Sequence, residues 1–380
     1  MSMPPAAASP PSEDNRPPID SLTGDSRLAG DSLPHVQPPT ATFILQLFLI
    51  PLVIVSIVVL LWLLFSWMAH MGRDNPQDLV KALQKGDDSS WQRAYELADL
   101  LRSPDPKYDA LRNDPVLAKK LADLLVQDLK APVQESDKVR IMRRMYLCRA
   151  VGSFHVPDGL PALLVAARQE RSPVEVEVRY SALEAVATLS HNCGPDFADE
   201  HPEVIELLLT SSREPDDSGP QPMTKEGEPT TYRPHAELRA VAAYALGVVG
   251  GEKATARLKL MLHDPYANAR YNAGTGLARA GDVACVPVLE EMLDPDNNQA
   301  ARDERYANDQ DHKRVTVLFN GIRATLTLAQ ANPSADMSGL KSSLKRLSES
   351  PLTQIQSDRT KIQGAALEAL RLLEADAARS

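Results

Sequence analysis

The sequence predicts an all-α protein: an α-α superhelix preceded by one transmembrane helix and a disordered N-terminal tail. Two observations indicate this architecture. An uncharged apolar run lies near residue 50, and a pattern of apolar residues recurs with an offset of 31 residues later in the chain.

The tail comprises residues 1–42, which are dense in Pro, Ser, Ala and Gly and contain almost no large apolar side chains. Such a segment cannot bury enough apolar surface to offset the conformational entropy lost on ordering. We therefore expect it to be disordered. The stretch PPSEDNRPP within it also has the composition of a proline-motif ligand, but a solvated tail is the simpler interpretation.

The next element, residues 43–69, contains no charged residue. Nineteen of the 23 residues from Phe43 to Phe65 are Phe, Ile, Leu or Val, and a helix of this length spans a hydrocarbon core of about 30 Å. A cleaved secretory signal would be shorter and nearer the N-terminus, and a buried core helix would not be apolar on every face. We therefore expect a retained single-pass anchor, with Trp62 and Trp67 near the membrane interface.

Positive charges predict the orientation of this anchor. Arg73, Lys81 and Lys85 follow the apolar run within about 20 residues, whereas only Arg27 precedes it. The positive-inside rule then places the C-terminal part of the chain in the cytoplasm. The expected localisation is the cell membrane, with a cytoplasmic C-terminal domain.

Residues 70–136 are predicted to form a linker and N-terminal capping helices. Three amphipathic stretches occur there: PQDLVKALQKG, SSWQRAYELADLLR and DPVLAKKLADLLVQDL. Each places its apolar residues on one helical face, which can cover the open end of the domain that follows.

Residues 137–380 are predicted to form a repeat domain. In one unit, apolar residues from Leu238 to Val249 recur with the spacing of one helical face. Gly250 and Gly251 end this helix, because glycine enters the left-handed conformation without steric cost. An offset of 31 residues superimposes this unit on the next, with seven identical pairs: Arg239/Arg270, Ala242/Ala273, Leu246/Leu277, Gly250/Gly281, Leu258/Leu289, Met261/Met292 and Leu262/Leu293. Two helices of this size cannot bury their apolar faces alone, so neighbouring units must stack.

Looser copies flank these two units, and the final TKIQGAALEALRLLEAD is predicted to cap the array. The patterns DPYANARYNAGTGLARAGD and AELRAVAAYALGVVGG resemble the short HEAT-like repeats associated with phycobilin lyases. The resemblance covers roughly residues 138–376 and implies an armadillo-type solenoid. It also implies that Asp264 and Arg270, six residues apart, bond between neighbouring units. Arg179 and Arg239 have no acid six residues before them, so a continuous ladder of such Asp–Arg pairs along the solenoid is not expected. We interpret these arginines as structural.

Catalytic and metal-binding motifs are not found. None of the eight histidines is followed by Glu, which removes the His-Glu ligands of iron-dependent hydroxylases built from this repeat. The sequence HNC at residues 191–193, with His201 nearby, lacks a recognised zinc spacing. Glu290 and Glu291 are adjacent, so their side chains diverge by about 100° on a helix. Phosphate loops, GxSxG and HExxH are also missing. We expect no catalytic residue, no cofactor and no metal.

Composition narrows the range of partners. The chain has 41 Lys and Arg against 51 Asp and Glu, without the basic excess of a nucleic-acid surface. Its three cysteines show no C-x-x-C spacing, which fits reduced thiols. The leading hypothesis is a non-catalytic, membrane-tethered scaffold or adaptor that binds a protein partner through its repeat surface. The resemblance implies an alternative, a phycobilin-lyase-like enzyme or chromophore-binding protein, and a purely structural membrane-associated protein is a third.

Two polar interruptions of the repeat, residues 213–235 and 296–312, predict where a partner binds. Each follows the second helix of one unit and precedes the first helix of another, so both should be exposed loops on the same edge, two units apart. Long surface loops are also simply tolerated. Both contain residue types enriched in interface anchors, namely Tyr232 and Arg233 in the first and Arg302, Arg305 and Tyr306 in the second.

Overall fold

The computed structural model describes residues 40–71, 81, 83, 89–217, 233–302, 304 and 306–377. The predicted tail, residues 1–42, lies almost entirely outside the described residues, as do most of the linker before residue 89 and the middle of the first insertion, residues 218–232. The chain divides into two units, Met1–Asp74 and Asn75–Ser380.

The first unit contains one helix, α1, Ala41–Met71, within its described residues. This helix includes the predicted span 43–69 and extends beyond it at both ends. Its segment Phe48–Trp67 has a mean hydropathy of 3.1 and is nowhere buried by other parts of the protein. Twenty helical residues extend for about 30 Å. By length and composition, α1 is therefore able to cross a membrane.

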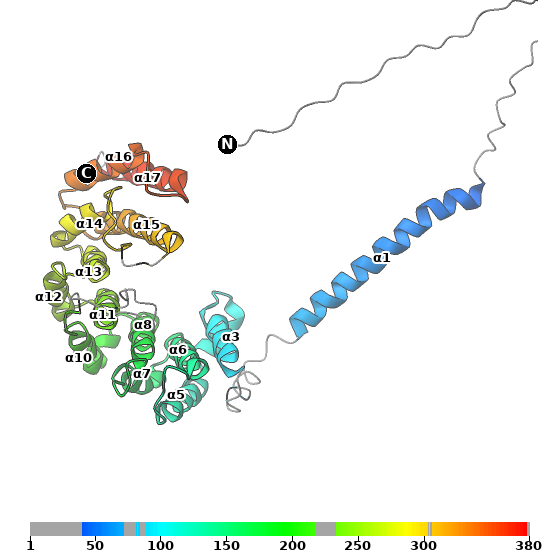
Figure 1. Cartoon of the computed structure of the whole chain (residues 1–380), viewed down its shortest axis with the longest axis horizontal. Coiled ribbons are helices and arrows are strands. Elements are labelled where there is room, and N and C mark those ends of the chain that lie inside the picture. The colour runs from blue at the N-terminus through cyan, green and yellow to red at the C-terminus, as the bar shows by residue number, and fades with distance from the viewer. Residues whose placement is uncertain are drawn as a thin grey trace, which may run out of the picture. The chain divides into compact units, whose positions relative to one another are not determined.

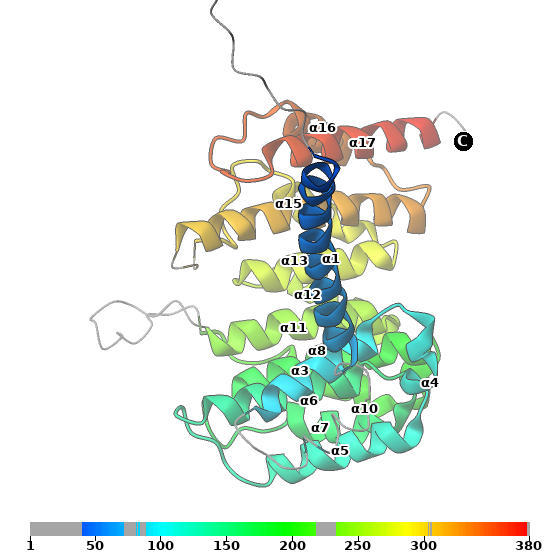
Figure 2. The same ribbon diagram turned by 90° about the vertical axis from the view of Figure 1, so that its right-hand side faces the viewer.

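The second unit consists of two layers of helices within its described residues (Figures 1 and 2). The inner layer follows the inside of the arc in Figure 1, and each helix packs against the next: α3 (Ser90–Arg102), α6 (Lys138–Gly152), α8 (Glu175–Cys193), α11 (Pro234–Val249), α13 (Ala267–Arg279) and α15 (Ala307–Ala331). The outer layer contains α5 (Pro115–Leu129), α7 (Leu160–Ala167), α10 (Pro202–Ser211), α12 (Glu252–Met261), α14 (Val286–Met292) and α16 (Ser338–Glu349). This arrangement confirms the predicted all-α solenoid.

Short helical segments join the two layers: η1 (Pro106–Tyr108), α4 (Asp109–Arg112), η2 (Pro157–Gly159), α9 (Phe197–Glu200) and η3 (Val283–Cys285). The last helix, α17 (Arg359–Ala377), packs on both α15 and α16 at the C-terminal end. At the other end, α3 packs on α6, and α5 packs on α6 and α7. The helices expected to be caps therefore continue both layers.

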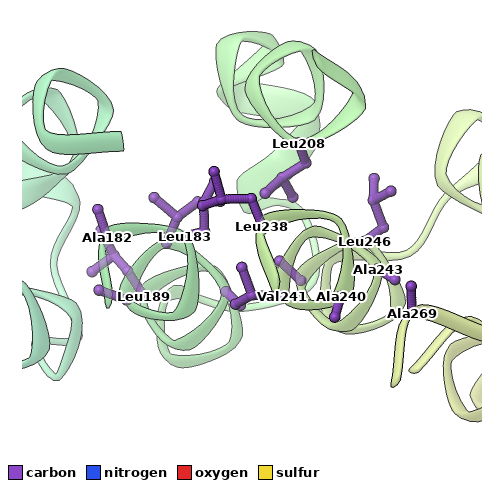
Figure 3. Packing of buried hydrophobic residues seen from close by; sticks show 14 of the residues in the cluster. Ala182, Leu183, Leu189, Leu208, Leu238, Ala240, Val241, Ala243, Leu246 and Ala269 are labelled. Carbon is purple, nitrogen blue, oxygen red and sulfur yellow. The ribbon is translucent and has the colours of Figure 1, made fainter. Parts of the chain in front are cut away.

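The core lies between the two layers. In α11, the predicted apolar face contains Leu238, Val241 and Leu246, each at most 2% exposed. Figure 3 shows Leu183 of α8 and Leu208 of α10 close to this face. The helix ends where the sequence predicts, because Gly250 and Gly251 both have positive φ angles, 72° and 85°. Apolar periodicity and the glycine stop together therefore define this unit.

Successive inner-layer helices approach one another closely. A Cβ atom added to Gly247 of α11 would lie 2.6 Å from the Cα atom of Gly276 in α13. A Cβ atom on Gly152 of α6 would lie 2.6 Å from the carbonyl oxygen of Ala185 in α8. These crossings require the small residues present there, because a larger side chain on either helix would push the backbones apart.

Candidate interaction edge

Arginine side chains connect successive units at one edge of the repeat domain. Arg144 in α6, Arg179 in α8 and Arg239 in α11 are buried, and Arg270 in α13 is half-buried. Each donates hydrogen bonds to backbone carbonyls at or just beyond the C-terminal end of the preceding outer-layer helix. Arg144 bonds to the carbonyls of Asp128 and Ala131, and Arg179 bonds to that of Ala167. Arg239 bonds to the carbonyls of Glu214 and Pro215, and Arg270 bonds to those of Asp264 and Pro265. Such carbonyls lack helical partners and carry partial negative charge. A ladder of arginine–carbonyl hydrogen bonds thus runs through four helices, and it differs from the Asp–Arg pairing that the repeat resemblance implies.

The carboxylates of this ladder do not follow the predicted six-residue spacing. The Asp264 carboxylate accepts two hydrogen bonds from Arg239, Nε to Oδ2 at 2.8 Å and Nη2 to Oδ1 at 3.1 Å. Arg270 instead donates from Nη1 to the backbone oxygen of Asp264, at 2.8 Å. Asp264 turns toward Arg239 because that guanidinium is buried and needs a counter-charge. Glu214 repeats the arrangement, with its carboxylate on Arg179 and its carbonyl accepting from Arg239.

The ladder also holds the two ends of the first insertion together. Arg233 donates from Nη1 to the backbone oxygen of Asp217 at 2.7 Å. The Asp217 carboxylate accepts from the backbone N–H of His235 at 3.0 Å, and His235 Nδ1 lies 2.8 Å from Glu214 Oε2. Residues 213–217 and 233–235 were expected to be freely exposed, but Glu214 is largely buried because it serves as a counter-charge. Tyr232 lies outside the described residues.

The second insertion is shorter than predicted, because α15 begins at Ala307 and includes residues up to 312. The reason is a contact made from within this helix: the Asp311 carboxylate accepts hydrogen bonds from the backbone N–H groups of Gln356 and Ser357, at 2.7 and 3.1 Å. Before the helix, Arg302 is exposed and Tyr306 is 62% exposed. Arg305 lies outside the described residues.

Charges of the second insertion and of α15 act on the start of α11, where the first insertion ends. Glu237, in the first turn of α11, accepts a hydrogen bond from the Tyr266 hydroxyl group. Burial raises the pKa of Glu237, and the negative charge of Glu304 raises it further. The hydrogen bond from Tyr266 and the positive charge of Lys313 oppose this rise. Lys313 Nζ lies 3.6 Å from Glu304 Oε1. We use the name insertion edge for residues 233–237 together with residues 302, 304, 306 and 313 of the second insertion and the start of α15.

The His, Cys and Glu side chains with the chemistry of metal ligands or acid–base groups make other contacts. Among the residues that the structure describes, no three His, Cys, Asp or Glu side chains could hold a metal ion. The His201 ring lies 4.6 Å from that of Phe197, and burial raises the pKa of the Cys193 thiol to about 11. Glu291 Oε1 accepts from Arg270 at 2.7 Å and from the Tyr271 hydroxyl at 2.8 Å. A thiol with this pKa stays protonated at neutral pH, which makes it a poor nucleophile or metal ligand.

Comparison with known proteins gives no family. No protein-family model matches the chain, and no curated protein matches it. Among solved structures, human deoxyhypusine hydroxylase in complex with glycerol matches with a TM-score of 0.28 and 18% sequence identity, over 82% of this chain and 99% of that chain. A match with this score carries no argument about function.

Proposed function

We propose that this protein is a non-catalytic, membrane-tethered scaffold or adaptor that binds a protein partner at the insertion edge. The observation that carries this proposal is an electrostatic link between the second insertion and the start of α11. Glu304 and Lys313 act electrostatically on Glu237, although two repeat units separate the insertions along the chain. This link supports a surface to which both insertions contribute.

The residues at this edge have the chemistry of a protein interface. Exposed Tyr306 and Arg302 belong to residue types that anchor many interfaces. The ladder arginines are used within the fold, on helix-end carbonyls and buried carboxylates. A phosphate-binding role for them is therefore not part of the proposal. A solenoid provides an extended binding surface without any cofactor.

The tether in this proposal is α1. Its segment Phe48–Trp67 is apolar on all sides and leaves its large side chains exposed, which is costly in water and favourable in a bilayer. The basic residues after α1 support a cytoplasmic position for the repeat domain in this proposal. Alkaline carbonate should leave the full chain in the membrane fraction, and protease added to intact cells should spare residues 89–377. Extraction by carbonate would contradict the membrane anchor, and digestion from outside would contradict the cytoplasmic position of the repeat domain.

The insertion edge is tested by site-specific photocrosslinking of the full chain in its own membrane. A photoreactive phenylalanine analogue replaces Tyr306, and a control chain carries it in place of Leu260, which is 67% exposed on outer-layer helix α12. We expect a discrete adduct from position 306, lost in an Arg302→Glu background, and none from position 260. Equal adducts at both positions, or none at position 306, place the partner elsewhere.

A further inference from the structure

The last helix of the repeat domain presents an exposed face. Helix α17 packs on α15 and α16 at the C-terminal end of the stack (Figure 2). The residues of its buried stripe are each at most 4% exposed: Ile362, Ala366, Ala369 and Leu373. A second stripe has the same spacing, begins two positions later and is exposed: Gly364, Glu368, Arg371 and Ala375. Two residues turn a helix by about 200°, so the exposed stripe points away from the rest of the domain.

Two large apolar side chains flank the exposed stripe. Leu367 is 40% exposed and Leu372 is 48% exposed, and their positions on the helix place them on opposite sides of the stripe. Among the described residues of the repeat domain, every other helix has at most one large apolar side chain exposed to this degree. A terminal repeat normally has a polar outer face, because that face meets water. The outer face of α17 is instead partly apolar.

The spacing of the exposed stripe is that of a seam between two helices. Its residues recur at intervals of four, three and four positions, which is the a and d pattern along which a second helix packs. Leu367 and Leu372 then occupy the flanking g and e positions. Small residues end the stripe on both sides, and a Cβ atom added to Gly364 would meet nothing within 4 Å. The outer face of α17 therefore has the pattern and the space to receive one further helix.

The charges of the exposed stripe select a second copy of α17 as the facing helix. Glu368 and Arg371 lie equally far from the midpoint of the stripe, which falls between Ala369 and Leu370. A two-fold axis through this midpoint aligns two α17 helices in antiparallel orientation, and each contact then occurs twice. It places Glu368 of each copy level with Arg371 of the other. Both side chains are exposed, and neither has an ion-pair partner among the described residues.

The same two-fold axis matches the other residues of the face. Gly364 of one copy lies level with Ala375 of the other, so small side chains face each other at both ends of the stripe. Leu367 lies on the same side as Leu367 of the second copy, and Leu372 likewise meets its symmetry mate, which removes apolar surface from water in both chains. A parallel arrangement would instead align glutamate with glutamate and arginine with arginine, and such like-charge pairs are unfavourable. The sequence of α17 is therefore self-complementary in the antiparallel arrangement.

We propose that α17 binds α17 of a second copy of this chain, in antiparallel orientation about a two-fold axis at the midpoint of the exposed stripe. One pair of helices of this length buries less area than the roughly 1,200 Å² at the lower limit of stable interfaces, so the contact is weak in dilute solution. Chains that share a membrane have a higher effective concentration, which favours the dimer. Only this last effect rests on the proposed tether, and the contact is independent of the insertion edge.

Disulfide crosslinking of the full chain in its own membrane tests the register. Two chains with different tags are coexpressed, one with Gly364→Cys and one with Ala375→Cys, both with Cys193→Ser because the other two cysteines are buried. We expect a mild oxidant to join the two chains. Either variant expressed alone should give at least about fivefold less dimer, because identical positions lie about 16 Å apart along the antiparallel helices, beyond the reach of a disulfide. Leu260→Cys, exposed on α12, measures random collisions.

Exchange of charges tests the pairing in a way that a change in folding does not imitate. With Glu368→Arg in both cysteine chains, a positive charge meets Arg371 at both levels of the seam, and we expect the disulfide yield to fall by about fivefold. With Glu368→Arg in one chain and Arg371→Glu in the other, opposite charges meet again at both levels, and we expect the yield of the parent pair. All of these variants should keep the circular dichroism spectrum of the parent, because both positions are exposed.

Four outcomes overturn the inference. The face does not bind a second copy if the coexpressed pair gives no more disulfide than Leu260→Cys. The two-fold register is wrong if Gly364→Cys alone crosslinks as strongly as the mixed pair, because identical positions meet only in a parallel arrangement. The charges do not select the partner if Glu368→Arg in both chains leaves the yield unchanged. A disulfide from position 364 to a different protein, in place of a second copy, would assign the outer face of α17 to that protein.

Discussion

Substitution of Asp264 by Ala tests the ladder most directly. The Arg239 and Asp264 side chains are only 5% and 7% exposed, and two hydrogen bonds join them. Removing one partner of a buried pair leaves an uncompensated charge and typically costs about 3–5 kcal/mol. Asp216 and Asp217 lie 3.9 and 4.0 Å from the Arg239 guanidinium and can offset part of the loss. We therefore expect a loss near the lower limit, about 3 kcal/mol.

The chain supplies a matched control at Asp294. Both aspartates precede a proline, and both accept a hydrogen bond from the backbone N–H two residues later, at 2.9 Å for Asp264 and 3.1 Å for Asp294. The Asp294 side chain is 41% exposed, however, and its partner Arg346 is 58% exposed at a distance of 3.7 Å. A solvent-exposed pair of this kind contributes less than about 1 kcal/mol. The difference between the two alanine variants therefore isolates the buried ion pair.

The assay is urea denaturation of the full chain in detergent, followed by helical circular dichroism, with thermal melts in parallel. For a domain of this size, a loss of about 3 kcal/mol lowers the melting temperature by about 5 °C. Replacing both partners, as Arg239→Met with Asp264→Ala, should recover part of the loss, because no unpaired charge is then buried. Equal losses for Asp264→Ala and Asp294→Ala would refute the assignment of a buried ladder.

Three further predictions concern the core, the helix crossings and pH. Leu246→Asp should unfold the repeat domain because Leu246 is fully buried. Leu260→Asp, at an exposed position, should melt within about 2 °C of the parent chain. Similar melting temperatures for the two variants would mean that the core face is wrongly placed. Gly247→Ala should lower the free energy of unfolding in urea by about 1–3 kcal/mol, because the added Cβ meets the backbone of α13. Gly364→Ala, in open space on α17, should raise it by about 0.5–1 kcal/mol. A greater stability of Gly247→Ala than of Gly364→Ala would contradict the close crossing. Burial raises the pKa of Asp311, but its hydrogen bonds with the loop before α17 outweigh this and lower the pKa below the ordinary 3.8. Its contribution to stability is therefore complete well above pH 4 and is lost as the pH falls through the folded pKa, so the urea midpoints of the parent chain and Asp311→Asn should differ at pH 7 and converge in acid.

The sequence predicts the solenoid because local signals determine most of it. Apolar residues at helical spacing, such as Leu238 to Leu246, identify the buried faces, and paired glycines mark where α11 ends. The ladder was harder to predict, because its acceptors are backbone carbonyls, which every residue possesses. Its acid Asp264 lies 25 residues after Arg239, and no short motif records that distance. The start of α15 was missed for the same reason, since Asp311 is held by residues 45 and 46 positions later.

The candidate sites were predictable only in part. Arg302 and Tyr306 could be selected by residue type, and their role in binding remains a prediction, as does the phycobilin-lyase-like alternative that the repeat resemblance implies. The counter-charge at Glu214 could not be selected in this way, because its carboxylate pairs with Arg179, 35 residues earlier in the sequence.

The contacts at the base of the first insertion explain why this edge can carry variable sequence. Arg233 and Asp217, its two ends, are joined by a hydrogen bond, and Glu214 beside them is a counter-charge for Arg179. The closure of the loop is thus fixed by residues of the ladder, and lengthening the chain between residues 217 and 233 adds only the slowly rising entropy of a longer loop. An edge whose base is closed by such contacts can acquire binding residues without loss of the fold.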